Sequence, residues 1–140
     1  MEKQVTIYDL LNQTVFRLHK LLKRELEKFD LSLNEFETLE HLYLYGEKPI
    51  QQIGRDIFHT TSSLTYLVDK LVGKKLVERI ASRNDRRKMY VGLTEKGVEL
   101  MDEILPRYHA RLDNILGDCT NEDTKHAMRF LEEIQNNIEL

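Results

Sequence analysis

The sequence predicts a mainly α-helical fold with a small β-wing, that is, a winged helix-turn-helix with extra helices at both ends. Prolines and glycines are scarce, with 2 and 6 in 140 residues. Apolar residues recur at helical spacing over most of the chain, and they alternate in one stretch near its middle. We expect one domain over residues 1–140, in which helices at about 5–30 and 95–140 flank a winged helix at about 33–93.

The first three helices follow from apolar spacing and from helix-ending residues. Residues 7–29 carry a single apolar stripe, which is typical of one long helix. Asn34 and Glu37 have the spacing of a capping box that opens a second helix, and Gly46 is placed to close it. Pro49 fits the first turn of a short third helix.

A fourth helix is expected over residues 60–74, after a tight connection at Phe58 and His59. Its first turn holds only small hydroxyl side chains, which would let the helix end approach base edges in a DNA major groove. This pattern predicts a helix-turn-helix whose second helix reads duplex DNA. The expected base contacts are Thr61, Ser62, Thr65 and Tyr66, with Thr60 and Ser63 in the same DNA-facing turn and Lys70, Lys74 and Lys75 on phosphates.

A two-stranded hairpin follows, because apolar residues alternate in residues 76–80 and again in 88–93. The net charge of the chain is -3, yet lysine and arginine far outnumber acidic residues between positions 70 and 90. Such asymmetry indicates a surface for an anionic partner, although a surface loop that is basic by chance would give the same composition. The wing residues expected at DNA are Arg83, Asp85, Arg86 and Arg87, since a wing tip can place arginine in a minor groove.

The chain ends in two further predicted helices. Thr94 is expected to cap the fifth helix, Pro106 to kink it or force a local adjustment, and Gly117 to end it. Thr120 and Asp123 would open the sixth. A winged helix needs neither these helices nor the first one. Their apolar faces therefore predict a second copy of the chain as partner, giving a homodimer.

Several motifs in order along the chain resemble the multiple-antibiotic-resistance regulator (MarR) family, and the resemblance covers nearly the whole chain. They are Leu33-Asn34-x-x-Glu37, the segment from Ile53-Gly54 to Ser63-Leu64-Thr65, Leu71-x-x-x-x-Leu76-Val77-Glu78-Arg79, Asp85-Arg86-Arg87 and Val91-x-Leu93-Thr94-x-x-Gly97. The resemblance implies a homodimer with interlocked terminal helices that binds a pseudo-palindromic operator, with repression as the expected mode.

The same resemblance implies a role for the wing and shows two departures from the family pattern. Arg87 would enter the minor groove, and the carboxylate of Asp85 would orient its guanidinium as a bidentate partner. Lys75 stands where the family usually has a glycine in a left-handed turn, and Gly54 replaces the usual alanine.

The signal that controls such a regulator has several candidates. Family members commonly bind a small aromatic or phenolic anion between the dimer helices and the winged helix. The residues that could line such a cleft are Arg17, His19, His41, Tyr45 and Tyr108. A redox-responsive regulator would use Cys119, although peroxide-sensing members carry their cysteine where this chain has Phe16. A metal-responsive one would use His109 with Asp113, and a regulator without any ligand is the fourth alternative.

Other function classes are not favoured by the sequence. A glycine-rich phosphate loop and a Gly-x-Ser-x-Gly motif are both missing, so we expect no enzyme, no cofactor and no metal. The absence of a long apolar stretch predicts no membrane partner, and a single cysteine fits a cytoplasmic location. The alternative from a different class is a winged helix that mediates protein contacts without binding DNA. It predicts a wing without cations, whereas this wing carries Arg83, Arg86, Arg87 and Lys88.

Overall fold

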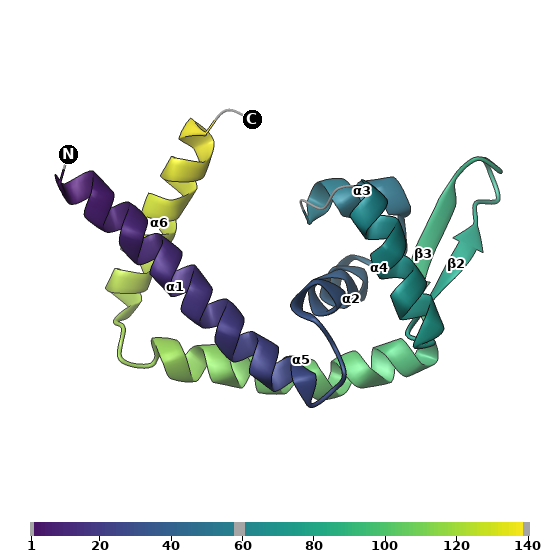
Figure 1. Cartoon of the computed structure of the whole chain (residues 1–140), viewed down its shortest axis with the longest axis horizontal. Helices are drawn as coiled ribbons and strands as arrows, with labels where there is room; N and C mark the ends of the chain where they lie inside the picture. Colours follow the sequence, from purple (N-terminus) through teal and green to yellow (C-terminus); the bar gives the residue numbers. More distant parts are fainter. Residues whose placement is uncertain (1, 58–60, 139–140) are drawn as a thin grey trace. The chain divides into compact units, whose positions relative to one another are not determined.

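The computed structural model describes residues 2–57 and 61–138 (Figure 1). The expected DNA-facing Thr60 and the connection at Phe58 and His59 lie outside the described residues. The chain divides into two compact units, one up to Met101 and one from Asp102 onward. The predicted fold class is confirmed: the described residues form six helices and a small antiparallel sheet.

The first unit begins with helices α1 (Glu2–Glu27) and α2 (Leu33–Tyr45). Helix α2 does open with a capping box, but the box consists of Ser32 and Glu35 rather than the expected Asn34 and Glu37. Ser32 has the extended backbone of an N-cap, with φ -81° and ψ 164°, and its side chain accepts a hydrogen bond from the Glu35 amide. Gly46 closes the helix as predicted, with φ 78°.

The helix-turn-helix and its wing complete most of this unit. Strand β1 (Lys48–Pro49) leads into α3 (Ile50–Asp56), and α4 (Thr61–Gly73) is followed by β2 (Val77–Ala81) and β3 (Met89–Leu93). The hairpin is confirmed, but the sheet has a third strand, in the order β1-β3-β2, with Lys48 opposite Val91. A two-residue strand has no periodicity, so the sequence offered no signal for β1.

A compact core fixes the position of α4. Side chains from α2, α3, α4 and β3 meet in this core and are fully or almost fully buried: Phe36, Leu39, Ile53, Leu64, Val68, Leu71 and Val91. Burial of one face of α4 leaves its opposite face exposed.

The C-terminal end of α4 turns through a left-handed residue. Lys75 has φ 62°, its amide donates to the Val72 carbonyl at 2.9 Å, and the Leu76 amide donates to the Leu71 carbonyl at 3.1 Å. These two bonds form a Schellman motif, in which the left-handed position usually holds glycine. The expected departure at Lys75 is therefore a non-glycine residue in a strained backbone conformation.

The C-terminal helices are α5 (Glu95–Leu116) and α6 (Asn121–Asn137). Helix α5 continues through Pro106 and ends before Gly117, and α6 opens with the predicted capping box of Thr120 and Asp123. No residue of α6 is buried. No helix in the described part of the chain is long and apolar enough to cross a membrane.

Candidate nucleic-acid interface

The exposed face of α4 carries most of the side chains expected to contact DNA. Ser63, Thr65, Tyr66 and Lys70 are all exposed, and Tyr66 is 66% exposed. The ammonium of Lys70 lies 5.4 Å from the centre of the Tyr66 ring, within the range of a cation–π contact. The backbone of Thr61 and Ser62 belongs to the first turn of α4, as predicted. Polar groups and a cation thus share one solvent-facing surface.

The three lysines expected on phosphates lie in different environments. Lys70 and Lys75 are exposed, whereas the Lys74 side chain is 28% exposed and turns toward the protein. Its Nζ atom lies 2.8 Å from Oε2 of Glu35. Lys74 therefore already has an anionic partner within the chain, which the sequence spacing did not reveal.

The wing tip is a hydrogen-bonded turn with basic side chains around it. The Ser82 hydroxyl accepts from the amides of Asn84 and Asp85 at 3.3 Å each. The Lys88 amide donates to the Asp85 carbonyl at 3.1 Å. Arg83, Arg86, Arg87 and Lys88 are exposed. Within the described residues, none of these four forms an ion pair, so their charge is available to an anionic partner.

The expected pairing of Asp85 with Arg87 takes a different form. The Asp85 carboxylate accepts a hydrogen bond from the backbone N–H of Arg87 at 2.9 Å, and among the described residues it forms no ion pair with the guanidinium. A backbone amide two residues ahead is a local partner that an Asp side chain reaches readily. Asp85 therefore holds the turn from which Arg87 projects, and the guanidinium itself is not clamped in this structure.

A pocket of about 360 Å³ lies between α3 and the wing, and positively charged side chains from both elements line it. It is lined by Pro49, Ile50, Gln51, Gln52, Arg55, Arg87, Lys88 and Met89. Arg55 comes from α3 and was not expected at this surface. Its approach to the wing depends on the pairing of β1 with β3, which sequence periodicity could not show.

A second pocket lies between α1 and the start of α2 and has a volume of about 530 Å³. It is lined by Phe16, His19, Lys20, Lys23, Ser32, Leu33 and Asn34. An aromatic ring together with a histidine and two lysines can accommodate an aromatic anion. The sequence had suggested only His19 of these, because Lys20 and Lys23 fit the solvated side of a long helix.

The other expected effector residues do not line this pocket. His41 lies with Nε2 3.0 Å from the Asp56 carboxylate and its ring 4.9 Å from the ring of Tyr45. Arg17 is exposed on α1, and Tyr108 belongs to the second unit. The structure thus joins His41 with Tyr45 and places His19 in a separate site.

Neither of the alternative sensors gains support from the structure. Cys119 is a free, exposed thiol in the segment between α5 and α6. In the part of the chain that is described, no three His, Cys, Asp or Glu side chains are grouped to hold a metal ion, and the pair His109 and Asp113 has no third member.

One buried charge lies beneath this interface. Glu35 is 2% exposed, and burial disfavours its charged form, which by itself would raise its pKa. The hydrogen bond and positive charge of Lys74, together with hydrogen bonds from Ser32, outweigh burial and hold the pKa of Glu35 below its ordinary value. Glu35 is therefore a carboxylate at neutral pH.

Comparison with known proteins identifies similar sequences and folds. The family model described as transcriptional regulator SarA/Rot matches residues 20–104. The HTH-type transcriptional regulator MhqR of Bacillus subtilis is 33% identical over 133 residues, which cover 95% of this chain and 92% of MhqR.

Solved structures of MarR-type regulators have the same fold. AbsC, a MarR family transcriptional regulator from Streptomyces coelicolor, superposes with a TM-score of 0.90 at 21% identity, covering 98% of this chain and 95% of AbsC. MepR from S. aureus, solved in complex with DNA, gives a TM-score of 0.85 at 20% identity. The superposition covers 93% of this chain and 96% of the MepR chain.

Proposed function

The chain belongs to the SarA/Rot family of transcriptional regulators, which have a MarR-type winged helix, and we propose that it binds a pseudo-palindromic DNA operator as a homodimer. Its family consists of transcriptional regulators and not enzymes. Each protomer would insert α4 into a major groove and the wing tip into an adjacent minor groove. A protein with this role works in the cytoplasm, where the bacterial chromosome lies.

The observation that carries this proposal is an exposed basic wing, without ion pairs among the described residues, beside a recognition helix with a polar surface. Arg83, Arg86, Arg87 and Lys88 have no acidic partner among the described residues. Cations without internal partners can each neutralise a phosphate and release a counterion. A winged helix that only bound other proteins would have no need of this charge.

The homodimer is supported by apolar side chains that the single chain leaves in solvent. Helix α1 exposes Ile7, Tyr8 and Val15 along one side, and α6 exposes Phe130 and Leu131. Large apolar side chains clustered on helix faces are typical of protein interfaces. A symmetric dimer would bury such faces and present two copies of α4 to one DNA site.

Selection from a random duplex library tests the function and identifies the operator in one experiment. Purified protein is incubated with the library, and bound duplexes are amplified and sequenced over several rounds. We expect enrichment of a pseudo-palindrome with half-sites about one helical turn apart, or a multiple of it. No enriched sequence, together with stable dimers, would favour the alternative of a protein-interaction module.

We further propose that the protein represses transcription and that a small aromatic or phenolic anion releases it from DNA. The pocket of about 530 Å³ supports this because it combines Phe16 with the basic side chains of Lys20 and Lys23. Repression follows from steric exclusion, since a dimer on a promoter blocks polymerase without a dedicated contact. In a transcription assay with the enriched operator, we expect reduced transcript with protein alone and recovery with millimolar 2-hydroxybenzoate. Release that survives Lys23→Met would assign the anion to another site.

A further inference from the structure

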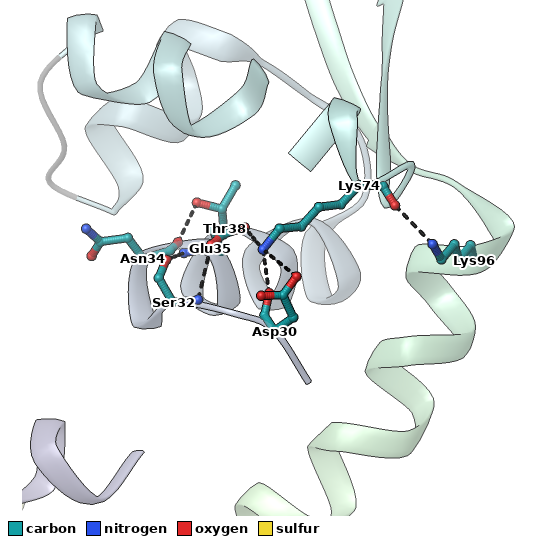
Figure 2. A network of polar contacts seen from close by, with 7 residues as sticks. All are labelled: Asp30, Ser32, Asn34, Glu35, Thr38, Lys74 and Lys96. Atoms are coloured by element: carbon teal, nitrogen blue, oxygen red, sulfur yellow. Dashed lines mark hydrogen bonds and ion pairs between the residues drawn. The ribbon is translucent and has the colours of Figure 1, made fainter. Parts of the chain in front are cut away.

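Lys74 connects the end of the recognition helix to a turn far away in the sequence. Lys74 directly follows α4, and Figure 2 shows its side chain extending to Asp30, in the turn between α1 and α2. There Nζ lies 2.8 Å from Oε2 of Glu35 and 3.8 Å from Oδ2 of Asp30, and it also donates a hydrogen bond to the Asp30 carbonyl. A long, flexible side chain is thus held by three oxygens.

Glu35 in turn is held by Ser32, the N-cap residue of α2. Its Oε1 accepts a hydrogen bond from the Ser32 backbone N–H at 3.1 Å, and its own amide donates to the Ser32 hydroxyl at 3.1 Å. Oε2 is buried, and the one ion pair that it forms among the described residues is with the Lys74 ammonium. A buried carboxylate that loses its counter-charge is strongly unfavourable, so Glu35 and Lys74 keep each other in place.

The same end of α4 is fixed from its other side. The Lys96 ammonium donates to the Lys74 carbonyl at 3.1 Å, and the Thr94 hydroxyl donates to the Lys75 carbonyl at 2.6 Å. Helix α4 spans 13 residues and is therefore about 20 Å long. A rotation of about 10° at this end would move the first turn by about 3 Å, a full hydrogen-bond length. The ion pair therefore acts together with the core packing of α4 in setting where the first turn of the helix lies.

The turn that holds Lys74 also forms a wall of the pocket beside α1. Ser32 and Asn34 line that pocket together with His19 and Lys23 of α1. One segment, residues 30–34, thus contacts the pocket on one side and the end of the recognition helix on the other. A shift of this segment moves Asp30, one partner of Lys74, and also Ser32, whose backbone N–H and hydroxyl hold Glu35, the other partner.

We propose that Glu35 and Lys74 are positioning residues, whose partly buried ion pair holds the end of α4 against the start of α2 and sets operator affinity without contacting DNA. The proposal rests on the proposed DNA-binding function. It replaces the expectation that Lys74 contacts a phosphate, since the ammonium is occupied within the chain. It also makes the turn at residues 30–34 the route by which an occupant of the pocket alters DNA affinity.

Glu35→Gln and Lys74→Met are the test variants, and Lys70→Met, in the last turn of α4, is the matched control. Affinity for the enriched duplex is measured at four salt concentrations, well below the unfolding temperature of each variant. A phosphate contact contributes about 0.9 to the slope of log affinity against log salt, so Lys70→Met lowers the slope by that amount. Lys74→Met leaves the slope unchanged and weakens affinity about tenfold.

Glu35→Gln separates positioning from simple electrostatics by the sign of its effect. Removing a negative charge would tighten DNA binding if charge alone mattered. Positioning instead predicts binding about tenfold weaker, and a loss in the double variant that is smaller than the sum of the single losses. A purely stabilising role would lower the unfolding temperature and leave the affinity of the folded protein unchanged. Lys74→Arg is expected to recover most of the affinity, because it restores the charge.

Amide hydrogen exchange provides a readout that does not depend on DNA. In Glu35→Gln, exchange should accelerate in the last turn of α4 and at Ser32, while β3 stays as protected as in the original chain. Unchanged protection of the last turn of α4 and of Ser32 in Glu35→Gln would overturn the proposal. So would a slope of log affinity against log salt that is lowered by about 0.9 in Lys74→Met. If the original chain binds enriched and scrambled duplexes equally, the proposed function fails, and hydrogen exchange still decides whether the ion pair holds α4.

Discussion

Replacing Lys75 by glycine should stabilise the protein, because Lys75 occupies a conformation that favours glycine. Its φ of 62° lies in the left-handed region, which costs a non-glycine residue about 1–2 kcal/mol. Glycine loses more backbone freedom on folding, at a cost of about 0.5–1 kcal/mol. The exposed Lys75 side chain makes no hydrogen bond or ion pair among the described residues, and the Schellman bonds use backbone groups only. Lys75→Gly should therefore raise the free energy of unfolding by about 0.5–1 kcal/mol.

Lys75→Ala is the matched control for this prediction. Lys75→Ala removes the same charge and the same flexible side chain but keeps the Cβ atom. The backbone strain of the left-handed conformation therefore remains in this variant. In thermal unfolding at equal protein concentration, Lys75→Gly should melt about 2–4 °C above Lys75→Ala, which should melt close to the original chain. Equal melting temperatures for the two variants would refute the reasoning, because they would show that the left-handed turn carries no strain that glycine relieves.

Four further changes probe other parts of the molecule. Arg87→Ala should weaken operator binding by about 1–3 kcal/mol in an anisotropy titration at fixed salt, and unchanged affinity would remove Arg87 from the interface. Gly97→Ala should cost about 3 kcal/mol in urea unfolding, since the new Cβ would lie 2.1 Å from the Leu76 carbonyl oxygen; a stability equal to that of the original chain would contradict this close approach. The charged Glu35 stabilises the fold above its ordinary pKa of 4.5, and this contribution is lost as the pH falls through its lowered folded-state value. Glu35→Gln should therefore flatten the acid side of the stability–pH curve, whereas curves that stay parallel would show that the carboxylate contributes nothing there. Leu131→Glu should raise the dimer dissociation constant by more than about 30-fold in sedimentation equilibrium, and an intact dimer would place the interface elsewhere.

The elements with strong local signals were predictable from the sequence. Apolar periodicity and caps such as Gly46 and Thr120 act within a few residues, so α2, α4, α6 and the hairpin lie close to their expected positions. The capping box of α2 was misplaced because Asn34 and Glu37 have the same spacing as Ser32 and Glu35. The extended backbone of Ser32 and its two hydrogen bonds with Glu35, which the spacing does not show, distinguish the two pairs.

The candidate interface was predictable in outline and not in its internal contacts. Exposure of Tyr66 and Lys70 follows from the helical period, and the basic wing follows from composition. The pairing of Lys74 with Glu35 joins positions 39 apart in the sequence, and it depends on tertiary packing that no local pattern encodes. Arg55 was missed for the same reason, since the long-range pairing of β1 with β3 brings α3 to the wing.

The most direct test of DNA recognition is an anisotropy titration of the original chain against the enriched duplex and a scrambled duplex of equal composition. It should be run at several salt concentrations. We expect binding to the enriched duplex that is at least about 1,000-fold tighter than binding to the scrambled one, with two protomers per duplex and an affinity that falls steeply with salt. Equal, weak binding to both duplexes would contradict a sequence-specific regulator and leave the basic wing without its proposed partner.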